Sequence, residues 1–262
     1  MSASDLHWTS AISEVRPNEV RLRGYRIDEL MGRVTFAEAV YLTLVGELPA
    51  PGVSRLLDAM LVSSIDHGAT PPSALAARTA ASTGAPLNAA VAAGVLSINR
   101  HHGGAIEDCM HMIHEVLALA ETNKLGIEDA ARELAAQYRE SRRRMAGFGH
   151  RIHTADPRTA RLFALAEEVG AARAGVTALR ALEAALEAET GRRLPINVDG
   201  AIAGLLVDLG VPAALANAFF IMARVPGLVA HVYEEQTRER PMRRIHPSDH
   251  VYDGPAARSL PE

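Results

Sequence analysis

The sequence GFGHRIHTADPR, from Gly147 to Arg158, joins two long segments that are rich in Ala, Leu, Glu and Arg. Both flanking segments repeat apolar residues at the three- and four-residue spacing of a helix. The connection itself concentrates two flexible glycines, two histidines and an Asp-Pro-Arg. Connections between rigid helices can hold functional groups that are both exposed and fixed in place. The stretch therefore predicts a helical protein with a functional site at this connection.

The composition of the whole chain favours an all-α fold. Its 262 residues are 48% hydrophobic but only 4% aromatic, and alanine is abundant. Small side chains let helices pack closely, and the length suffices for one large domain or two modest ones. A β-like pattern is confined to the first 30 residues, where Pro17 and Asn18 separate two alternating runs. We expect an all-α fold with a small N-terminal β-hairpin.

Local signals place several of the helices. Thr35 and Glu38 form the pattern of a capping box, and Gly46 ends the same helix. The segment PLNAAVAAGVLSI (86–98) is apolar almost all round, which predicts a central helix. Residues 213–223 are expected to form a buried core helix, because no apolar run approaches the roughly 20 residues of a membrane span. We therefore expect no membrane partner.

Charge and cysteine content exclude several classes of protein. The formal net charge is −4 and the pI about 6.3, so no basic field indicates nucleic-acid binding. The chain has one cysteine, Cys109, so we expect no disulfide framework and a cytoplasmic location. Cys109 lies in a predicted buried helix, where an inert core thiol is favoured over a nucleophile. The N-terminal residues do not have the pattern of a signal peptide.

Four polar clusters fall at predicted helix junctions: residues 66–68, 100–105, 147–158 and 195–204. A helix N-terminus presents free N–H groups that suit carboxylates or phosphates. Structural interpretations stay open at this point. Asp199 could be an N-cap, and His101 and His102 could be solvated loop residues.

The residue types in these clusters indicate a particular chemistry. Histidine and aspartate together can move a proton from carbon and polarise a carbonyl group. Arginines bind carboxylates through paired hydrogen bonds, and the candidates are Arg100, Arg151, Arg158, Arg224, Arg240, Arg243 and Arg244. The sequence has no zinc pattern, phosphate loop or dinucleotide fingerprint. We expect carbon-acid or carbon–carbon bond chemistry on a polycarboxylate, without a metal.

Five ordered motifs resemble the citrate synthase superfamily: RGYRIDELMGRVTFAEAVYLTLVGELP, HHGGA, GFGHRIHTADPR, INVDG and ARVPGLVAHVYEE. The resemblance runs from about Arg21 to Tyr252. Within the superfamily the chain is most similar to the citryl-CoA lyase group, which comprises stand-alone lyases and the C-terminal module of ATP-citrate lyase. The short chain, the NVDG helix and the IHPSDHVYD segment favour lyases over synthases.

The resemblance implies an all-α fold with a large domain (1–103 and 225–262) and a small domain (104–224), with the active site between them. It also implies a homodimer in which one arginine crosses to the neighbouring active site, and further assembly of dimers stays open. The implied substrate is an acyl-CoA thioester. The implied reaction is retro-Claisen cleavage of citryl-CoA to acetyl-CoA and oxaloacetate, without a metal or redox cofactor.

The resemblance also implies roles for three catalytic residues. His150 matches the histidine that contacts the substrate hydroxyl, as general base and oxyanion partner. Asp199 matches the carboxyl group that protonates the enolate carbon, which requires a raised pKa in a desolvated cleft. His102 matches the histidine of the His-Gly-Gly motif that steadies the thioester enolate oxygen in synthases. Its implied role is auxiliary, because the ATP-citrate lyase module has phenylalanine at this place, and His101 is the alternative.

The remaining implied roles concern binding. Arg158, Arg224 and His67 match substrate-binding residues. Arg244 is the candidate for the arginine that crosses the dimer, with Arg240 and Arg243 as rivals. The backbone of Gly147, Phe148 and Gly149 matches the loop that approaches the CoA adenine.

Three alternatives remain open from the sequence. The first is a synthase that condenses an acyl-CoA with a 2-oxo acid, as citrate and 2-methylcitrate synthases do. The second is a lyase that acts on another 3-hydroxyacyl-CoA. The third is a non-catalytic helical binding module, against which the set of His150, Asp199 and arginines argues.

Overall fold

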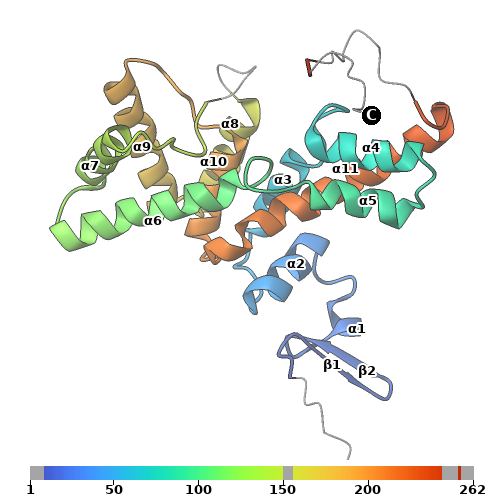
Figure 1. Cartoon of the computed structure of the whole chain (residues 1–262). Coiled ribbons are helices and arrows are strands. Elements are labelled where there is room, and N and C mark those ends of the chain that lie inside the picture. Colours follow the sequence, from blue (N-terminus) through green and yellow to red (C-terminus); the bar gives the residue numbers. More distant parts are fainter. Residues whose placement is uncertain (1–8, 150–155, 244–252, 255–262) are drawn as a thin grey trace, which may run out of the picture.

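The computed structural model describes residues 9–149, 156–243 and 253–254, and it has the predicted all-α fold with a small N-terminal sheet (Figure 1). The helices within these residues are α1 (Ile27–Leu30), α2 (Phe36–Val45), α3 (Ser54–Ser63), α4 (Pro72–Ser82), α5 (Leu87–Leu96), α6 (Ala105–Asn123), α7 (Ile127–Glu140), α8 (Pro157–Glu168), α9 (Ala174–Thr190), α10 (Val198–Asp208) and α11 (Ala216–Arg238). A 3-10 turn, η1 (Ala213–Leu215), precedes α11.

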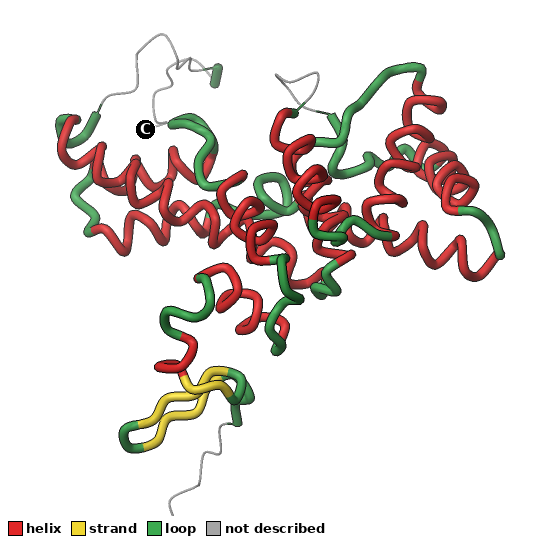
Figure 2. The backbone as a smooth tube through the Cα atoms, turned by 180° about the vertical axis from the view of Figure 1, so that it is seen from behind, coloured by secondary structure: helices red, strands yellow, loops and turns green. Residues whose placement is uncertain are grey.

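The N-terminal sheet contains the predicted hairpin, and it projects away from the helices (Figure 2). Strands β1 (Ser13–Arg16), β2 (Glu19–Leu22) and β3 (Tyr25–Arg26) are antiparallel in that order. The β1–β2 turn is made by Pro17 and Asn18, and Asn18 adopts a left-handed φ of 60°, a conformation that asparagine tolerates. The hairpin prediction is confirmed, and β3 is an addition that the sequence did not indicate.

The helices gather in two groups on opposite sides of the molecule (Figure 1). On one side α6 packs against α7, α9 and α10, and on the other α11 packs against α4 and α5. Small residues allow the close contacts: a Cβ on Gly94 of α5 would lie 2.9 Å from the Ser73 carbonyl oxygen of α4. The predicted domain boundaries stay a prediction, and the one after Arg224 falls inside the continuous helix α11.

The local signals for α2 are confirmed. The Thr35 side chain accepts a hydrogen bond from the Glu38 N–H, and the Glu38 carboxylate accepts one from the Thr35 N–H. Gly46 ends the helix with a left-handed φ of 99°. Cys109 lies as expected in the buried part of α6 as a free cysteine, and burial raises the pKa of its thiol.

The prediction that the apolar segment 86–98 forms a central helix is wrong for the isolated chain. Its helix, α5, buries Ala90 and Gly94 against α4 and α11, but Leu96 is 78% exposed. A helix that is apolar on every face is fully buried only where other elements or another chain cover each face. Within one chain, no such surface covers this face among the described residues.

The expectation that no segment approaches a membrane span also needs correction. Residues Ala213–Arg238 form a helical segment of 26 residues that is long and apolar enough for a span by length and composition alone. In the structure this segment is a core element: Phe219, Ala223, Arg224 and Leu228 are buried, and α11 contacts α3, α4, α5 and α6. The helix continues through Arg224 and Pro226, which the shorter apolar run did not reveal.

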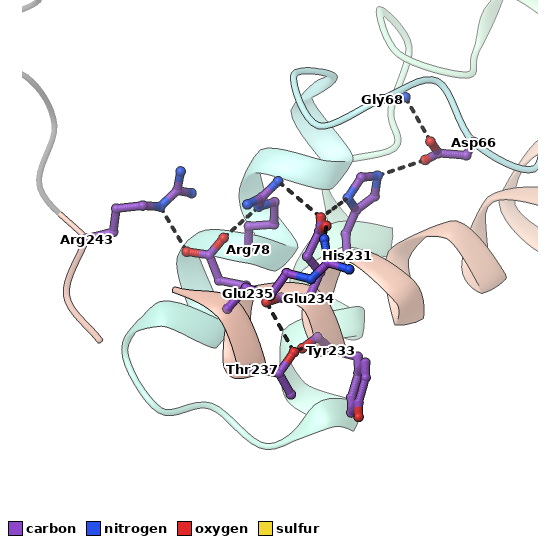
Figure 3. Close-up of polar contacts among 10 residues, drawn as sticks. Asp66, Gly68, Arg78, His231, Tyr233, Glu234, Glu235, Thr237 and Arg243 are labelled. Atoms are coloured by element: carbon purple, nitrogen blue, oxygen red, sulfur yellow. Dashed lines mark hydrogen bonds and ion pairs between the residues drawn. The ribbon is translucent and has the colours of Figure 1, made fainter. Parts of the chain in front are cut away.

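A buried ion pair connects α4 to α11 (Figure 3). Arg78 donates its Nε to the Glu235 carboxylate at 2.6 Å, and the Glu235 side chain is 1% exposed. Arg243 donates its Nε to the other Glu235 oxygen at 2.9 Å. Removing one partner of a buried pair leaves an uncompensated charge, which costs far more than the loss of an exposed pair.

We predict that Glu235→Ala lowers the free energy of unfolding by about 3 kcal/mol or more, because Arg78 is left buried without its main carboxylate partner. Denaturant unfolding followed by circular dichroism measures the change. Glu168→Ala is the matched control, since within the part of the chain that the structure describes Glu168 forms exposed ion pairs with Arg55 and Arg161, and its loss should cost less than about 1 kcal/mol. Equal effects of the two substitutions would contradict the prediction.

Candidate active site

Two motifs that lie about fifty residues apart meet in a short antiparallel contact. Phe148 and Ile196 form an isolated β-bridge. The Gly149 N–H donates to the Pro195 carbonyl at 2.7 Å, and the Asn197 N–H donates to the Gly147 carbonyl at 3.0 Å. The Asn197 side chain adds a hydrogen bond to the Gly149 carbonyl at 2.9 Å. The contact places the connection 147–149 beside the N-terminus of α10.

Glycine is required on both sides of this contact. A Cβ on Gly147, which has a φ of 87°, would lie 2.6 Å from the Cys109 Sγ. A Cβ on Gly200 would lie 2.4 Å from the Gly147 carbonyl oxygen. Distances below 3.0 Å are not tolerated between such atoms, so the two backbones meet directly. The close approach explains why both motifs contain glycine at these places.

The loop proposed to contact CoA already makes core contacts and hydrogen bonds within the chain. The Phe148 side chain is 5% exposed and belongs to the hydrophobic core. The Gly147 and Gly149 carbonyls accept hydrogen bonds from Asn197. The assignment of Gly147, Phe148 and Gly149 to CoA binding stays a prediction.

Asn197, not Asp199, caps α10. The Asn197 side chain accepts a hydrogen bond from the Gly200 N–H at 3.0 Å, which satisfies one of the free N–H groups of the first turn. The alternative that Asp199 is the N-cap is therefore wrong. Asp199 lies in the first turn of α10, two residues after this cap.

The environment of Asp199 disfavours its charged form. Burial raises the pKa of the Asp199 carboxyl group above its ordinary value, although the nearby Arg158 and Arg224 guanidinium groups act in the opposite direction. Desolvation exceeds the two favourable charges here. A raised pKa is the direction that the predicted role as proton donor requires.

The Arg158 side chain is held by Asp156, the residue at the N-terminus of the same helix. Its Nε and Nη2 donate to the two Asp156 carboxylate oxygens at 3.0 and 2.8 Å, and its Nη1 donates to the Ser63 carbonyl at 3.2 Å. Asp156 is also the N-cap of α8. The guanidinium fork that would bind a substrate carboxylate is thus already engaged.

Arg224 has a different arrangement. It is 4% exposed, its Nε donates to the Ser64 carbonyl at 3.0 Å, and its guanidinium carbon lies 4.8 Å from the centre of the Phe220 ring. Within the described residues its two Nη groups have no hydrogen-bond partner. Burial lowers the pKa of Arg224, while Asp66 and Asp199 raise it. The ordinary pKa of arginine is so high that the guanidinium group stays charged here despite this lowering.

His102 lies against the same aromatic ring. Its ring centre is 5.7 Å from that of Phe220, at an angle of 81°. The Ser73 N–H donates to His102 Nε2 at 3.4 Å, and the Ser73 Oγ lies 2.8 Å from the same nitrogen. A backbone N–H can only donate, so Nε2 is the acceptor and Nδ1 carries the proton. Burial, followed by the charges of Arg224 and His67, lowers the pKa of His102 and favours the neutral ring.

His67 belongs to the turn that follows α3. The turn is closed by a hydrogen bond from the Gly68 N–H to the Asp66 carboxylate at 2.9 Å. His67 is exposed and close enough to His102 for its charge to lower the pKa of that ring. The structure therefore brings His67, His102, Asp199 and Arg224 into one neighbourhood.

Two predicted residues, His150 and Arg244, lie outside the described residues. Of the rivals to Arg244, Arg243 donates to Glu235 of the same chain, and Arg240 is exposed. Their assignment to a dimer-crossing role stays a prediction.

The sequence reasoning missed three residues that organise the site. Asp156 holds Arg158, Ser73 orients His102, and Asp66 closes the turn of His67. A signal was present for two of them, since Asp156 belongs to the Asp-Pro-Arg motif and Asp66 precedes His67 directly. Ser73 had none, because it lies in α4, 29 residues from His102 along the chain.

A pocket of about 390 Å³ adjoins the HHGGA turn on the side of α6 and α11. Its lining residues are Ile98, Asn99, Arg100, Gly103, Gly104, Glu107, Asp108, His111, Asn217 and Ile221. Among the described residues no group of three or more His, Cys, Asp or Glu side chains is placed to hold a metal ion.

We predict that Asp199→Asn raises the free energy of unfolding at pH 7. Burial raises the pKa of Asp199 in the folded state. Above the ordinary carboxyl pKa the unfolded chain therefore ionises this group more readily than the folded protein, which lowers stability, and asparagine removes this effect. The stabilisation should shrink as the pH falls towards the ordinary carboxyl value, where wild-type Asp199 is protonated. Denaturant unfolding at pH 7 and pH 4 measures this difference, and a less stable variant at pH 7 would contradict it.

Comparison with known proteins identifies the family. The model "Citrate synthase, C-terminal domain" matches residues 49–247. Citrate synthase of Haloferax volcanii is 31% identical over 204 residues, which are 76% of this chain and 51% of that protein. Citrate/2-methylcitrate synthase of Bacillus subtilis is 31% identical over 76% of this chain and 52% of that protein. The chain spans about half the length of these curated relatives.

Solved structures extend the likeness over the whole chain. The structure of citryl-CoA lyase from Hydrogenobacter thermophilus is 42% identical with a TM-score of 0.89, and the match covers 97% of both chains. An ATP citrate lyase from Methanosaeta concilii, in complex with (3S)-citryl-CoA, has a TM-score of 0.79 at 20% identity over 97% of this chain and 43% of that one, which shows a shared fold. With a family model that matches most of its residues and a fold shared over its whole length, this chain belongs to the citrate synthase family.

Proposed function

We propose that the chain is a citryl-CoA lyase, which cleaves citryl-CoA to acetyl-CoA and oxaloacetate. The observation that carries the proposal is the 42% identity to citryl-CoA lyase from Hydrogenobacter thermophilus over 97% of both chains. The curated synthases of Haloferax volcanii and Bacillus subtilis are matched over only about half of their own length. The neighbourhood of His67, His102, Asp199 and Arg224 supports the proposal with groups suited to the reaction.

The proposed reaction begins at the substrate hydroxyl. His150 accepts the hydroxyl proton as the adjacent carbon–carbon bond breaks, which forms the carbonyl of oxaloacetate and the enolate of acetyl-CoA. Asp199, kept protonated by burial, donates its proton to the enolate carbon. His150 and Asp199 thus exchange one proton each with the substrate, so the overall cleavage needs neither water nor a redox partner.

The enolate oxygen requires a hydrogen-bond donor as charge develops on it. His102 supplies Nδ1–H for this purpose, because the Ser73 N–H occupies Nε2. A neutral imidazole is sufficient, and the lowered pKa of His102 keeps the ring neutral at physiological pH. Since the thioester itself stabilises the enolate, we propose that no metal or redox cofactor takes part.

The substrate carboxylates require positive charge. Arg224 is the main candidate, since its Nε donates to the Ser64 carbonyl and its Nη groups have no hydrogen-bond partner among the described residues. Arg158 is held by Asp156, so its contribution is positive potential or a contact that displaces one of those hydrogen bonds. His67 adds a donor from the turn after α3.

The reaction direction needs its own test, because the same residues serve a synthase. We predict that the protein converts citryl-CoA to acetyl-CoA and oxaloacetate, measured by coupling oxaloacetate to malate dehydrogenase. A second assay follows free CoA from acetyl-CoA plus oxaloacetate. Rapid CoA release only in the second assay would overturn the lyase proposal in favour of a synthase. Other 3-hydroxyacyl-CoA esters, tested for acetyl-CoA release, decide between lyase substrates.

Asp199→Asn should lower kcat for citryl-CoA cleavage by about 10²–10⁴-fold, because asparagine cannot donate the carbon-bound proton. The matched control is Asp129→Asn, which changes an exposed residue of α7 and should leave kcat unchanged. An Asp199→Asn protein with normal turnover would place the chemistry elsewhere or revive the non-catalytic alternative.

We also propose a homodimer, in which Arg244 reaches the neighbouring active site. The support is an apolar stripe on α5: Ala89, Ala92 and Leu96 are exposed at spacings of three and four residues. Such a face of small residues ending in a leucine suits packing against a helix of a second chain.

Leu96→Arg should therefore dissociate the dimer, since a buried unpaired guanidinium is strongly unfavourable in an interface. Light scattering during gel filtration measures the mass, which should fall from twice the 28.0 kDa chain mass to 28.0 kDa. Leu125→Arg, at an exposed leucine between α6 and α7, is the control and should keep the dimer mass. A wild-type chain that is monomeric, or a Leu96→Arg chain that stays dimeric, would contradict the proposed interface.

A further inference from the structure

The segment that carries His67 lies along one face of α11. Its backbone is fixed at two successive carbonyls: Arg158 donates to the Ser63 carbonyl at 3.2 Å, and Arg224 donates to the Ser64 carbonyl at 3.0 Å. The segment therefore leaves α3 in a defined direction before it reaches the turn at Asp66.

The next contact is made directly by the α11 backbone. A Cβ on Gly227 would lie 2.4 Å from the Ile65 carbonyl oxygen and 3.0 Å from the Asp66 Oδ1. Residues three and four apart share one face of a helix. These spacings place Arg224, Gly227 and His231 on one face of α11, and the segment runs along this track of three residues.

His231 makes the last contact of this track (Figure 3). Its Nε2 lies 2.9 Å from the Asp66 Oδ1, and its side chain is 13% exposed. The other Asp66 oxygen accepts the Gly68 N–H at 2.9 Å. The Asp66 carboxylate therefore joins α11 to the turn that presents His67, with one oxygen for each side.

The position of Asp66 also matters for Arg224. The Asp66 charge is close enough to raise the pKa of Arg224, so the two groups lie within electrostatic reach. A carboxylate released from its present partner would be drawn to an arginine whose Nη groups have no partner among the described residues. Such a pairing would occupy the fork that the proposed function assigns to a substrate carboxylate.

We propose that His231 is a positioning residue for the active site: by holding the Asp66 carboxylate, it fixes the turn that carries His67 and keeps Asp66 off Arg224. This inference rests on the proposed function for its kinetic consequences. His231 itself does not touch the substrate. On the other side of its ring, Nδ1 lies 3.9 Å from a Glu234 carboxylate oxygen, and Arg78 lies at the same distance from that oxygen.

The first test removes the hydrogen bond of His231. His231→Leu should raise KM for citryl-CoA about tenfold with kcat changed by less than about threefold, because one charge-assisted contact to a substrate carboxylate is lost. His231→Gln, which keeps an N–H donor at a similar distance, should restore most of the wild-type KM. His114→Leu, on the exposed side of α6, is the control and should behave as wild type.

The second test separates positioning from general stability. Adding Asp66→Asn to His231→Leu should lower KM again, because a neutral amide does not pair with Arg224. A merely structural role predicts no recovery of KM, since a second substitution in the same contact would either weaken the fold further or have no effect on KM. If His231→Leu does not fold, His231→Met removes the same donor with a more adaptable side chain.

Three results would overturn the inference: an unchanged KM in His231→Leu, equal losses in the Leu and Gln variants, or no recovery in the double variant. Hydrogen exchange distinguishes these from failure of the proposed function. If the wild-type protein does not cleave citryl-CoA, His231→Leu must still speed exchange of the Gly68 N–H, while His114→Leu must not. Unchanged exchange at Gly68 would show that His231 does not hold the turn.

Discussion

The antiparallel contact between Phe148 and Ile196 is the interaction on which the candidate site depends. It consists of few hydrogen bonds, but the direct meeting of Gly147 with Gly200 leaves no room for adjustment. The contact sets the position of the first turn of α10, and thereby that of Asp199. Asn197 serves both sides, because its side chain caps α10 and also binds the Gly149 carbonyl. One asparagine thus couples the helix terminus to the loop.

The charges around Asp199 are arranged unequally. Arg158 and Arg224 both favour its ionised form, yet burial prevails and raises its pKa. Arg158 is neutralised by Asp156, whereas Arg224 is buried against Phe220 with its Nη groups unpaired among the described residues. A buried acid beside a guanidinium group with unpaired N–H donors lowers the stability of the fold. The same arrangement is suited to binding an anion. Stability is supplied elsewhere, mainly by the hydrophobic core that includes α6–α10.

Helix α11 has several tasks at once. Its first half completes the core through Phe219 and Ala223, and its middle supplies Arg224. The face formed by Arg224, Gly227 and His231 contacts the segment after α3, so a single rigid helix relates that segment to Arg224, which we propose binds a substrate carboxylate. The second half contacts α4 and α5, next to the apolar stripe that we assign to a dimer. A change in this helix would therefore reach the site and the interface together.

The sequence alone determined the features that depend on residues close together in the chain, and it determined the family through the order of its motifs. The capping box of Thr35, the turn at Asn18 and the helical periods are local, so they predicted α2, the hairpin and the all-α class. The motifs indicated the family, and they supplied the candidate residues of which the structure brings His67, His102, Asp199 and Arg224 together. Tertiary structure decided the rest: α5 is exposed on one face, Asn197 is the cap, Asp156 occupies Arg158, and Asp66 pairs with a histidine 165 residues away. Burial and hydrogen-bond partners depend on which distant segments meet in space, and no local pattern contains that information.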